Sequence, residues 1–108
     1  MRALIIGAGD AGTRLAQKLC SENHEVVVID EDTAALNKLE AALDIMTVPG
    51  HGANPAVLTD AQIKKADVVV CVTKNWDTNI LAGMMAKKAG AKHVVARVGD
   101  TAYLQDYD

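Results

Sequence analysis

Aromatic side chains are almost missing from this chain of 108 residues, which has no phenylalanine, one tryptophan and two tyrosines. Half of the residues are nevertheless apolar, so the core has to be built from valine, isoleucine, leucine, alanine and methionine. This composition is typical of a parallel β-sheet that is buried on both faces. The length suits one domain, and we predict no domain boundary within residues 1–108.

A basic surface is also lacking, because 11 lysines and arginines stand against 14 aspartates and glutamates, a formal net charge of −3. Nucleic acid is therefore not expected as a partner, since phosphate backbones bind to basic surfaces and bases stack on aromatic side chains. No apolar run approaches the roughly 18 to 20 residues of a membrane span. The chain begins directly with a strand-like segment, which leaves no room for a signal peptide. We therefore expect a cytoplasmic protein that does not insert into the membrane.

Cysteine and serine are scarce, and their positions do not suggest catalysis. Cys20 and Cys71 are far apart and lack the spacing of metal ligands, so we expect two reduced, buried thiols. Ser21 is the only serine and has no histidine partner nearby. The three histidines are scattered, without ligand spacing. The sequence therefore predicts neither a metal site nor a catalytic group, and we expect a protein that is not an enzyme.

Glycine, in contrast, is concentrated at the start of the chain, directly after the strand-like run at residues 2–6. Gly7, Gly9 and Gly12 have the spacing G-x-G-x-x-G. In dinucleotide-binding folds the first glycine allows a tight turn, the second lets a pyrophosphate approach the backbone, and the third lets helix and strand pack closely. The turn also presents N–H groups at a helix N-terminus, where anions bind. Glycines that serve only a tight turn are the structural alternative.

An acidic residue follows at the spacing that suits a ribose. The second strand-like run, residues 25–29, ends in Asp30. This residue follows Gly12 by close to the roughly 20 residues at which an acidic side chain meets a ribose 2′-hydroxyl. Glu31 and Asp32 come next, with no arginine beside them, so a 2′-phosphate would meet only negative charge. The pattern predicts NAD or NADH, with ATP, ADP or AMP as the alternative, in preference to NADP.

Strand-like and helix-like segments alternate along the whole chain, as in β-α-β units with a parallel sheet. Strands are predicted at 2–6, 25–29, 45–48, 67–73 and 93–98. Helices are predicted over about 10–20, after a cap at Asp32 or Thr33, after Asn54 as N-cap, and from 80 to 88 after the start signal Asp77-Thr78-Asn79, with Gly90 closing this fourth helix. One more helix is predicted to begin within 100–108. The predicted fold is α/β, a Rossmann-like doubly wound parallel sheet with strand order 3-2-1-4-5, truncated after the fifth strand.

In this order the ligand cleft lies at the carboxyl ends of the first and fourth strands. The predicted cofactor-binding residues stand just past strands: Gly7, Ala8, Gly9, Asp10, Ala11, Gly12, Asp30, Thr73, Lys74 and Arg97. We expect Asp10 to cap the first helix rather than to face a phosphate. For Arg97, a phosphate contact and a surface salt bridge are both open. For Lys74, a phosphate contact and a solvated loop position are both open.

Taken together, these segments resemble the nucleotide-binding N-terminal lobe of potassium-transport regulators, the RCK/KTN or Trk-type cytoplasmic subunits. The resemblance is carried by residues 5–12, 27–32, 50–52, 66–70, 77–80 and 95–98, and it covers nearly the whole chain. The segments Asp-Thr-Asn-Ile and Ala-Arg-Val are more particular to this family than the glycine motif. The resemblance implies a homodimer or larger ring that binds NAD(H) or an adenine nucleotide. It also implies control of a membrane potassium channel or transporter subunit, at the inner face of the membrane.

The chain departs from that family pattern in length and in the cleft. It stops at Asp108, where the family's lobe continues, so we expect a piece of a longer protein or a natural short form. His51 stands where the family commonly has an acidic residue, and Lys74 replaces a small or acidic one. Both changes add potential positive charge near the nucleotide. The alternative function is a detached NAD-binding domain of a dehydrogenase, which would need a second domain to hold its substrate.

Overall fold

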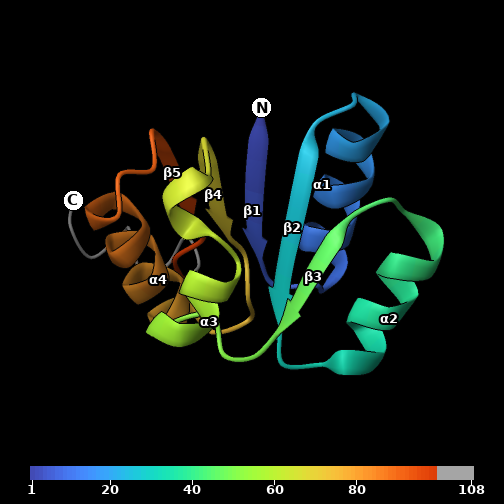
Figure 1. Ribbon diagram of the computed structural model, residues 1–108. Helices are drawn as coiled ribbons and strands as arrows, with labels where there is room; N and C mark the ends of the chain where they lie inside the picture. The colour runs from blue at the N-terminus through green and yellow to red at the C-terminus, as the bar shows by residue number, and fades with distance from the viewer. Residues whose placement is uncertain (100–108) are drawn as a thin grey trace.

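The computed structural model describes residues 1–99 and shows a five-stranded parallel sheet in the order β3-β2-β1-β4-β5 (Figure 1). The predicted doubly wound α/β fold is confirmed. The strands are β1 (Arg2–Ile6), β2 (Glu25–Asp30), β3 (Met46–Pro49), β4 (Val68–Cys71) and β5 (His93–Ala96), and the helices are α1 (Asp10–Ser21), α2 (Thr33–Ala42), α3 (Pro55–Asp60), the 3-10 helix η1 (Ile63–Lys65) and α4 (Trp76–Lys88). The helix predicted over 100–108 lies outside the described residues.

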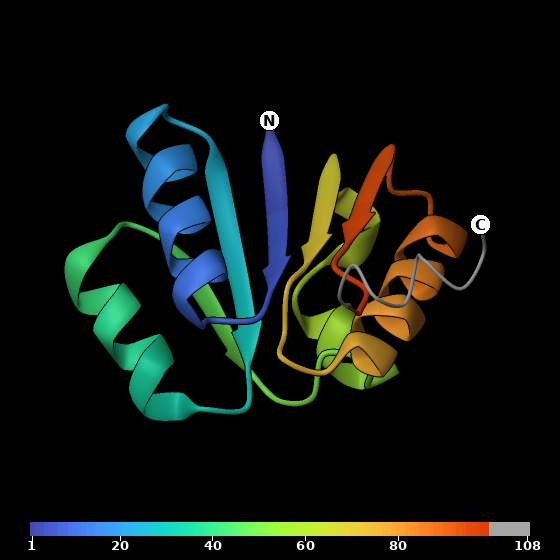
Figure 2. The same ribbon diagram turned by 180° about the vertical axis from the view of Figure 1, so that it is seen from behind.

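Helices cover both faces of the sheet (Figures 1 and 2). Side chains of α3 and α4 pack with Leu4 and Ile6 on one face, whereas side chains of α1 and α2 pack with Ile5 and Val28 on the other. Successive residues of a strand point to opposite faces, so β1 supplies both cores. The aliphatic composition is thus explained by strands that are buried on both sides. The second face is less complete over β5, where Val95 is 57% exposed.

The two central strands send their helices to opposite faces. After β1 the chain enters α1, whose Ala16 lies in one core, and after β4 it enters α4, whose Ala82 and Ala86 lie in the other. The connections after β1 and β4 therefore diverge, which opens a crevice at the carboxyl ends of these two strands. This divergence positions the candidate site.

The ends of the helices follow the predicted chemistry in most cases. Asn54 caps α3 by accepting from the N–H of Ala56 at 2.9 Å, and Asp32 caps α2 by accepting from the N–H of Ala35 at 3.1 Å. Gly90 follows α4 with φ +102°, a conformation that favours glycine. The predictions for these three ends are confirmed.

The start of α4 differs from the prediction. Asn75 is the N-cap, in an extended conformation, and its side chain accepts from the backbone N–H groups of Asp77 and Thr78 at 3.0 and 3.4 Å. The predicted start signal, residues 77–79, therefore lies inside the helix. The difference matters because it moves Asn79 from a loop into a packed helix.

Candidate functional site

A cleft of about 550 Å³ opens at the carboxyl ends of the strands, within the usual size range of small-molecule sites. Nine of the ten predicted site residues line it, and Gly12 is the one that does not. The lining residues from the predicted set are Gly7, Ala8, Gly9, Asp10, Ala11, Asp30, Thr73, Lys74 and Arg97. Further lining residues follow β2 and β3 or stand at the start of α4: Glu31, Asp32, Gly50, His51, Gly52, Asn75 and Thr78.

The three motif glycines have different surroundings. Gly7 has φ +120°, and a Cβ there would lie 2.9 Å from the backbone of Val72 and Thr73. A Cβ on Gly12 would lie 1.8 Å from the carbonyl oxygen of Gly7, so this glycine lets α1 pack against the turn. A Cβ on Gly9 would meet nothing within 4 Å. Gly7 and Gly12 therefore serve the turn itself, whereas the space beside Gly9 is free for a ligand.

Asp10 is not the cap that was predicted. Gly9 is the N-cap, because its carbonyl oxygen accepts the helical N–H of Thr13 at 2.9 Å, and no side chain caps this end of α1. Asp10 is the first residue of the helix and is exposed. The prediction is wrong because the tight turn places the cap position on the second glycine. As an acid in the first turn, Asp10 complements the positive end of the helix dipole.

Asp30 ties the glycine turn to the end of β2. Its Oδ2 accepts from the backbone N–H of Ala8 at 2.6 Å, and its Oδ1 accepts from the N–H of Asp32 at 2.8 Å. The carboxylate is therefore held in one orientation at the wall of the cleft. Each carboxylate oxygen can accept a further hydrogen bond, so Asp30 can still accept hydrogen bonds from a ligand in the cleft while it is bonded to Ala8 and Asp32.

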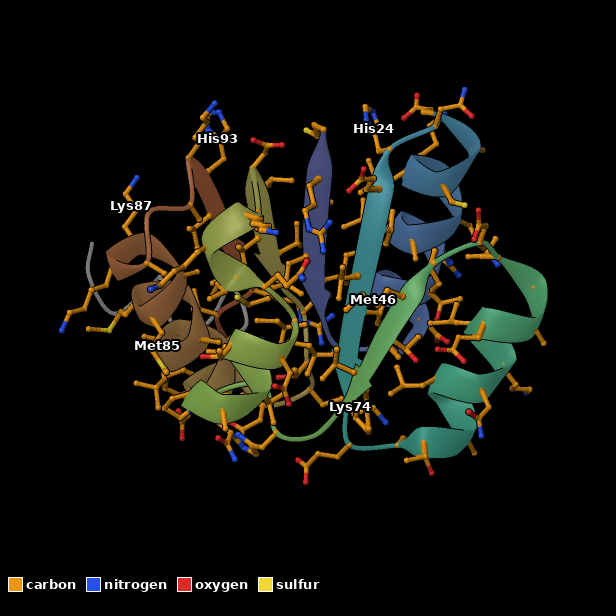
Figure 3. The ribbon with its side chains drawn as sticks, in the orientation of Figure 1. His24, Met46, Lys74, Met85, Lys87 and His93 are labelled. Atoms are coloured by element: carbon orange, nitrogen blue, oxygen red, sulfur yellow. The ribbon has the colours of Figure 1, made fainter. Side chains whose placement is uncertain are left out.

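The opposite wall carries the cationic groups. Lys74 is exposed in the loop after β4, and Figure 3 shows it at the carboxyl edge of the sheet, with His24 and His93 at the other edge. Arg97 follows β5, and its Nη2 donates to the carbonyl oxygen of Thr73 at 3.3 Å. Within residues 1–99, Arg97 forms no ion pair with a carboxylate. The cleft thus places acids at β2 opposite cations at β4 and β5.

His51 lies in the loop after β3 and lines the same cleft. The backbone N–H of Ala53 donates to its Nδ1 at 3.1 Å, so in the neutral ring the proton is carried by Nε2. A Cβ on Gly52 would lie 2.3 Å from a methyl group of Ile6. Glycine is therefore needed there for the loop to pack against β1.

Sequence reasoning missed Asn79, which is completely buried beneath the cleft. Its Oδ1 accepts from the backbone N–H and the hydroxyl of Thr73, at 2.9 and 2.6 Å. Its Nδ2 donates to the carbonyl oxygens of Thr73 and Arg97, at 3.1 and 2.9 Å. One signal could have found it: Asn79, Ala82 and Ala86 recur at i, i+3 and i+7, so the asparagine lies on the buried stripe of α4.

The two cysteines differ from one another. Cys71 is free and fully buried in β4, and this burial raises the pKa of its thiol to about 11. Cys20 is free but only half-buried, so the prediction of a buried thiol is wrong there. The buried residues of α1 are Gly12 and Ala16, and Cys20 lies a turn beyond them.

In residues 1–99, no group of three or more histidine, cysteine, aspartate or glutamate side chains is placed to hold a metal ion. No helix in this range is long and apolar enough to cross a membrane.

Comparison with known proteins identifies relatives over nearly the whole chain. The model of the TrkA-N domain family matches residues 3–107. The chain is 41% identical over 104 residues to the Trk system potassium uptake protein TrkA homolog of Archaeoglobus fulgidus, and the match covers 96% of this chain and 23% of that protein. The chain thus spans about a quarter of the length of the curated relatives it matches.

Solved structures share the fold. The Kef CTD of Shewanella denitrificans in its AMP-bound form has a TM-score of 0.81 and 19% sequence identity, and the match covers 99% of this chain and 65% of that chain. The enzyme WbmG of Bordetella bronchiseptica in complex with NAD has a TM-score of 0.68 and 25% identity, covering 87% and 36%. At these identities the similarity concerns the architecture.

Proposed function

Because this chain belongs to the TrkA-N domain family, we propose that residues 1–108 form one nucleotide-binding domain that regulates a membrane potassium channel or transporter. The observation that carries the proposal is the cleft at the carboxyl ends of β1 and β4, which joins a glycine turn, an oriented carboxylate and two cations. The name of the Archaeoglobus relative supports the link to potassium transport. That relative is about four times as long, so the link is part of the proposal.

The ribose is proposed to bind at Asp30. The bonds from Ala8 and Asp32 hold this carboxylate in place, so it can accept from ribose hydroxyls without losing further side-chain entropy. Glu31 and Asp32 line the same wall and would repel a phosphate on the 2′ position. NADP should therefore bind more weakly than NAD, by roughly the ten- to hundredfold that loss of a charged hydrogen bond costs.

The phosphates are proposed to bind between the glycine turn and the cationic wall. A phosphate in the free space beside Gly9 would lie against the N-terminus of α1, where backbone N–H groups and the helix dipole attract anions. Ala8 and Ala11 belong to this turn, and Gly12 supports it from behind. Lys74 and Arg97 face the same space from β4 and β5. Their charges would neutralise a pyrophosphate.

NAD or NADH is the ligand proposed first, with ATP, ADP or AMP as the alternative. All of these share an adenosine with a free 2′-hydroxyl and at least one phosphate, which are the groups that the cleft can recognise. Among the solved structures with this fold, one contains NAD and another contains AMP. These two complexes are compatible with both ligand classes.

We propose that the nucleotide is bound and not consumed. A ligand regulates a partner only if two conformations of the protein bind it with different affinity. The groups facing the cleft stand on separate elements, so a bound phosphate would draw the ends of β1, β4 and β5 together. A detached dehydrogenase domain is the alternative, and turnover of NADH or ATP by the isolated chain would contradict the regulatory role.

Self-association is part of the proposal, with the potassium channel or transporter as partner at the cytoplasmic face of the membrane. The outer side of α4 exposes several large apolar side chains: Trp76, Ile80, Leu81 and Met84. Met84 is 65% exposed, and an apolar helix face of this kind is more stable when a second subunit covers it. Sedimentation that shows only monomer at tens of micromolar would contradict this part.

Calorimetric titration with NAD, NADH, NADP, ATP, ADP and AMP tests the nucleotide site directly. The informative variant is Gly9→Ala, whose methyl group meets no protein atom and should leave the unfolding free energy unchanged. The same methyl group occupies the space proposed for phosphate, so affinity should fall. Gly90→Ala is the control for lost stability: its φ of +102° strains an alanine, but it lies outside the cleft, so this variant should be less stable and keep wild-type affinity. Unchanged affinity in Gly9→Ala would contradict the phosphate site.

A further inference from the structure

Asn79 is a buried polar side chain with every hydrogen-bonding group in use. An amide side chain has two donor hydrogens and two acceptor lone pairs. Here both acceptor positions bond to Thr73, one donor bonds to the carbonyl oxygen of Thr73, and the other bonds to the carbonyl oxygen of Arg97. A side chain of another shape could not make these four bonds together. Its role therefore depends on what Thr73 and Arg97 do.

The four bonds join the ends of β4 and β5 from below the cleft. The backbone N–H of Arg97 donates to the carbonyl oxygen of Cys71 at 2.9 Å, and its carbonyl oxygen accepts from Asn79. The guanidinium of Arg97 then donates to the carbonyl oxygen of Thr73, which Asn79 also holds. Among the described strands, β5 pairs only with β4. Asn79 is thus a second attachment that holds Arg97 beside Thr73.

We propose that Asn79 is a positioning residue for the phosphate of the bound nucleotide, acting through Arg97 without touching the ligand. The inference rests on the proposed nucleotide site. Arg97 is exposed at the cleft wall, and a guanidinium binds phosphate well only when its planar donors are correctly oriented. Asn79 supplies that orientation by holding both the backbone of Arg97 and the carbonyl group on which its side chain rests.

The test compares ADP with adenosine, since ADP contains the adenosine and pyrophosphate groups that NAD, NADH and ATP share. Affinities are measured for wild type, Asn79→Ala, Arg97→Ala and the double variant, at a temperature where each is folded. Asn79→Ala should weaken ADP by roughly ten- to a hundredfold, as expected for a lost charged hydrogen bond, and leave adenosine unchanged. In the Arg97→Ala background, the same substitution should have little further effect on ADP, because residues that act as a unit are not additive.

Two further variants separate positioning from general destabilisation. Ala86→Gly removes a buried methyl group from the same helix and lowers stability without touching the bonds of Asn79, so its ADP affinity should match wild type. If Asn79→Ala does not fold, Asn79→Asp replaces it, because aspartate keeps the size and the acceptors for Thr73 but loses the donors to the carbonyl oxygens of Thr73 and Arg97. If the new carboxylate simply repels ADP, the loss of ADP affinity would persist in the Arg97→Ala background. If the loss comes from a misplaced Arg97, it would disappear in that background.

Several results would overturn the inference while the proposed function stood. These are equal weakening of ADP and adenosine, additive effects of the Asn79 and Arg97 substitutions, or unchanged ADP affinity in a folded Asn79 variant. Failure of both Asn79 variants to fold would assign the residue to folding alone and would also overturn it. In contrast, wild type that bound none of the six nucleotides would remove the proposed function itself, and the inference with it.

Discussion

The two ends of the parallel sheet use their polar side chains differently. At the amino end, side chains from separate elements bond to one another: the guanidinium of Arg2 donates to Glu25 at 2.8 Å and to Gln62 at 2.5 Å. At the carboxyl end, Asp30 accepts from backbone N–H groups, and three of the four hydrogen bonds of Asn79 go to backbone groups of the turns. Arg2 and Glu25 at the amino end therefore neutralise each other, whereas Asp30, Lys74 and Arg97 at the carboxyl end form no ion pair within residues 1–99 and stay available to a ligand.

Aspartate has different roles at the two ends of the sheet. Asp67 at the amino end and Asp30 at the carboxyl end each accept a backbone N–H, from Arg2 at 2.8 Å and from Ala8 at 2.6 Å. Asp67 closes a contact between β4 and β1, and Asp30 in addition lines the cleft. Two chemically equivalent bonds thus serve stability at one end, and stability together with the proposed binding site at the other.

The largest effect should come from Gly12→Ala, behind the glycine turn. The new Cβ would lie 1.8 Å from the carbonyl oxygen of Gly7, and a backbone atom cannot move aside as a flexible side chain can. We expect a loss of more than about 3 kcal/mol in the unfolding free energy, at or above the upper end for overpacking. Urea unfolding followed by circular dichroism measures it, with Gly9→Ala as the control that should unfold like wild type. Equal stability of the two variants would contradict the described turn.

The second-largest effect is expected for Asp30→Ala at the carboxyl end, measured against Asp67→Ala at the amino end. Asp30→Ala should weaken NAD by roughly ten- to a hundredfold, because a charged ribose contact is lost. Asp67→Ala removes one backbone tie at the far end and should leave the NAD affinity of the folded protein unchanged. Both variants should unfold at lower urea concentration than wild type. Equal NAD affinities in the two variants would show that the carboxyl end has no special role in binding.

A smaller effect is expected from pH at the amino end. The N–H of Arg2 lowers the pKa of the Asp67 carboxyl below its ordinary value of 3.8, and the positive charges of Lys92 and the chain terminus act in the same direction. The ionised form is therefore favoured in the folded state, so its stabilisation is complete above about pH 3.8, the ordinary value, and is lost as the pH falls through the lowered pKa. Urea midpoints from pH 6 down to pH 2.5 should fall less in Asp67→Asn than in wild type. An equal fall of the urea midpoint in wild type and Asp67→Asn would contradict a stabilising role of the ionised Asp67 carboxylate.

The smallest effect should come from the exposed ion pair at the same end. Arg2 Nη1 and Glu25 Oε2 are 2.8 Å apart, but the side chain of Glu25 is 73% exposed. Glu25→Gln should therefore cost at most about 1 kcal/mol. The loss should shrink further in 1 M salt, because screening weakens exposed pairs. A salt-independent loss would mean that Glu25 contributes through packing rather than charge.

Much of the cleft was predictable, because its parts are short segments that follow strands. Gly7, Gly9 and Asp30 line the cleft at the carboxyl ends of their strands, as the motif spacing predicted. The N-cap of α1 was not predictable from residue preference alone. Asp10 is the better capping side chain, but the geometry of the turn assigned the position to Gly9.

The sequence by itself determined the alternation of strands and helices, the strand order and the edge of the sheet where the cleft lies. These features depend on local patterns: apolar runs, glycine spacing and the residues that follow each strand. Only the tertiary structure decided what Asn79 contacts. These contacts require Thr73 and Arg97, which are 24 residues apart, to meet at the ends of neighbouring strands. Such a meeting is set by sheet register and helix packing, which no local pattern contains.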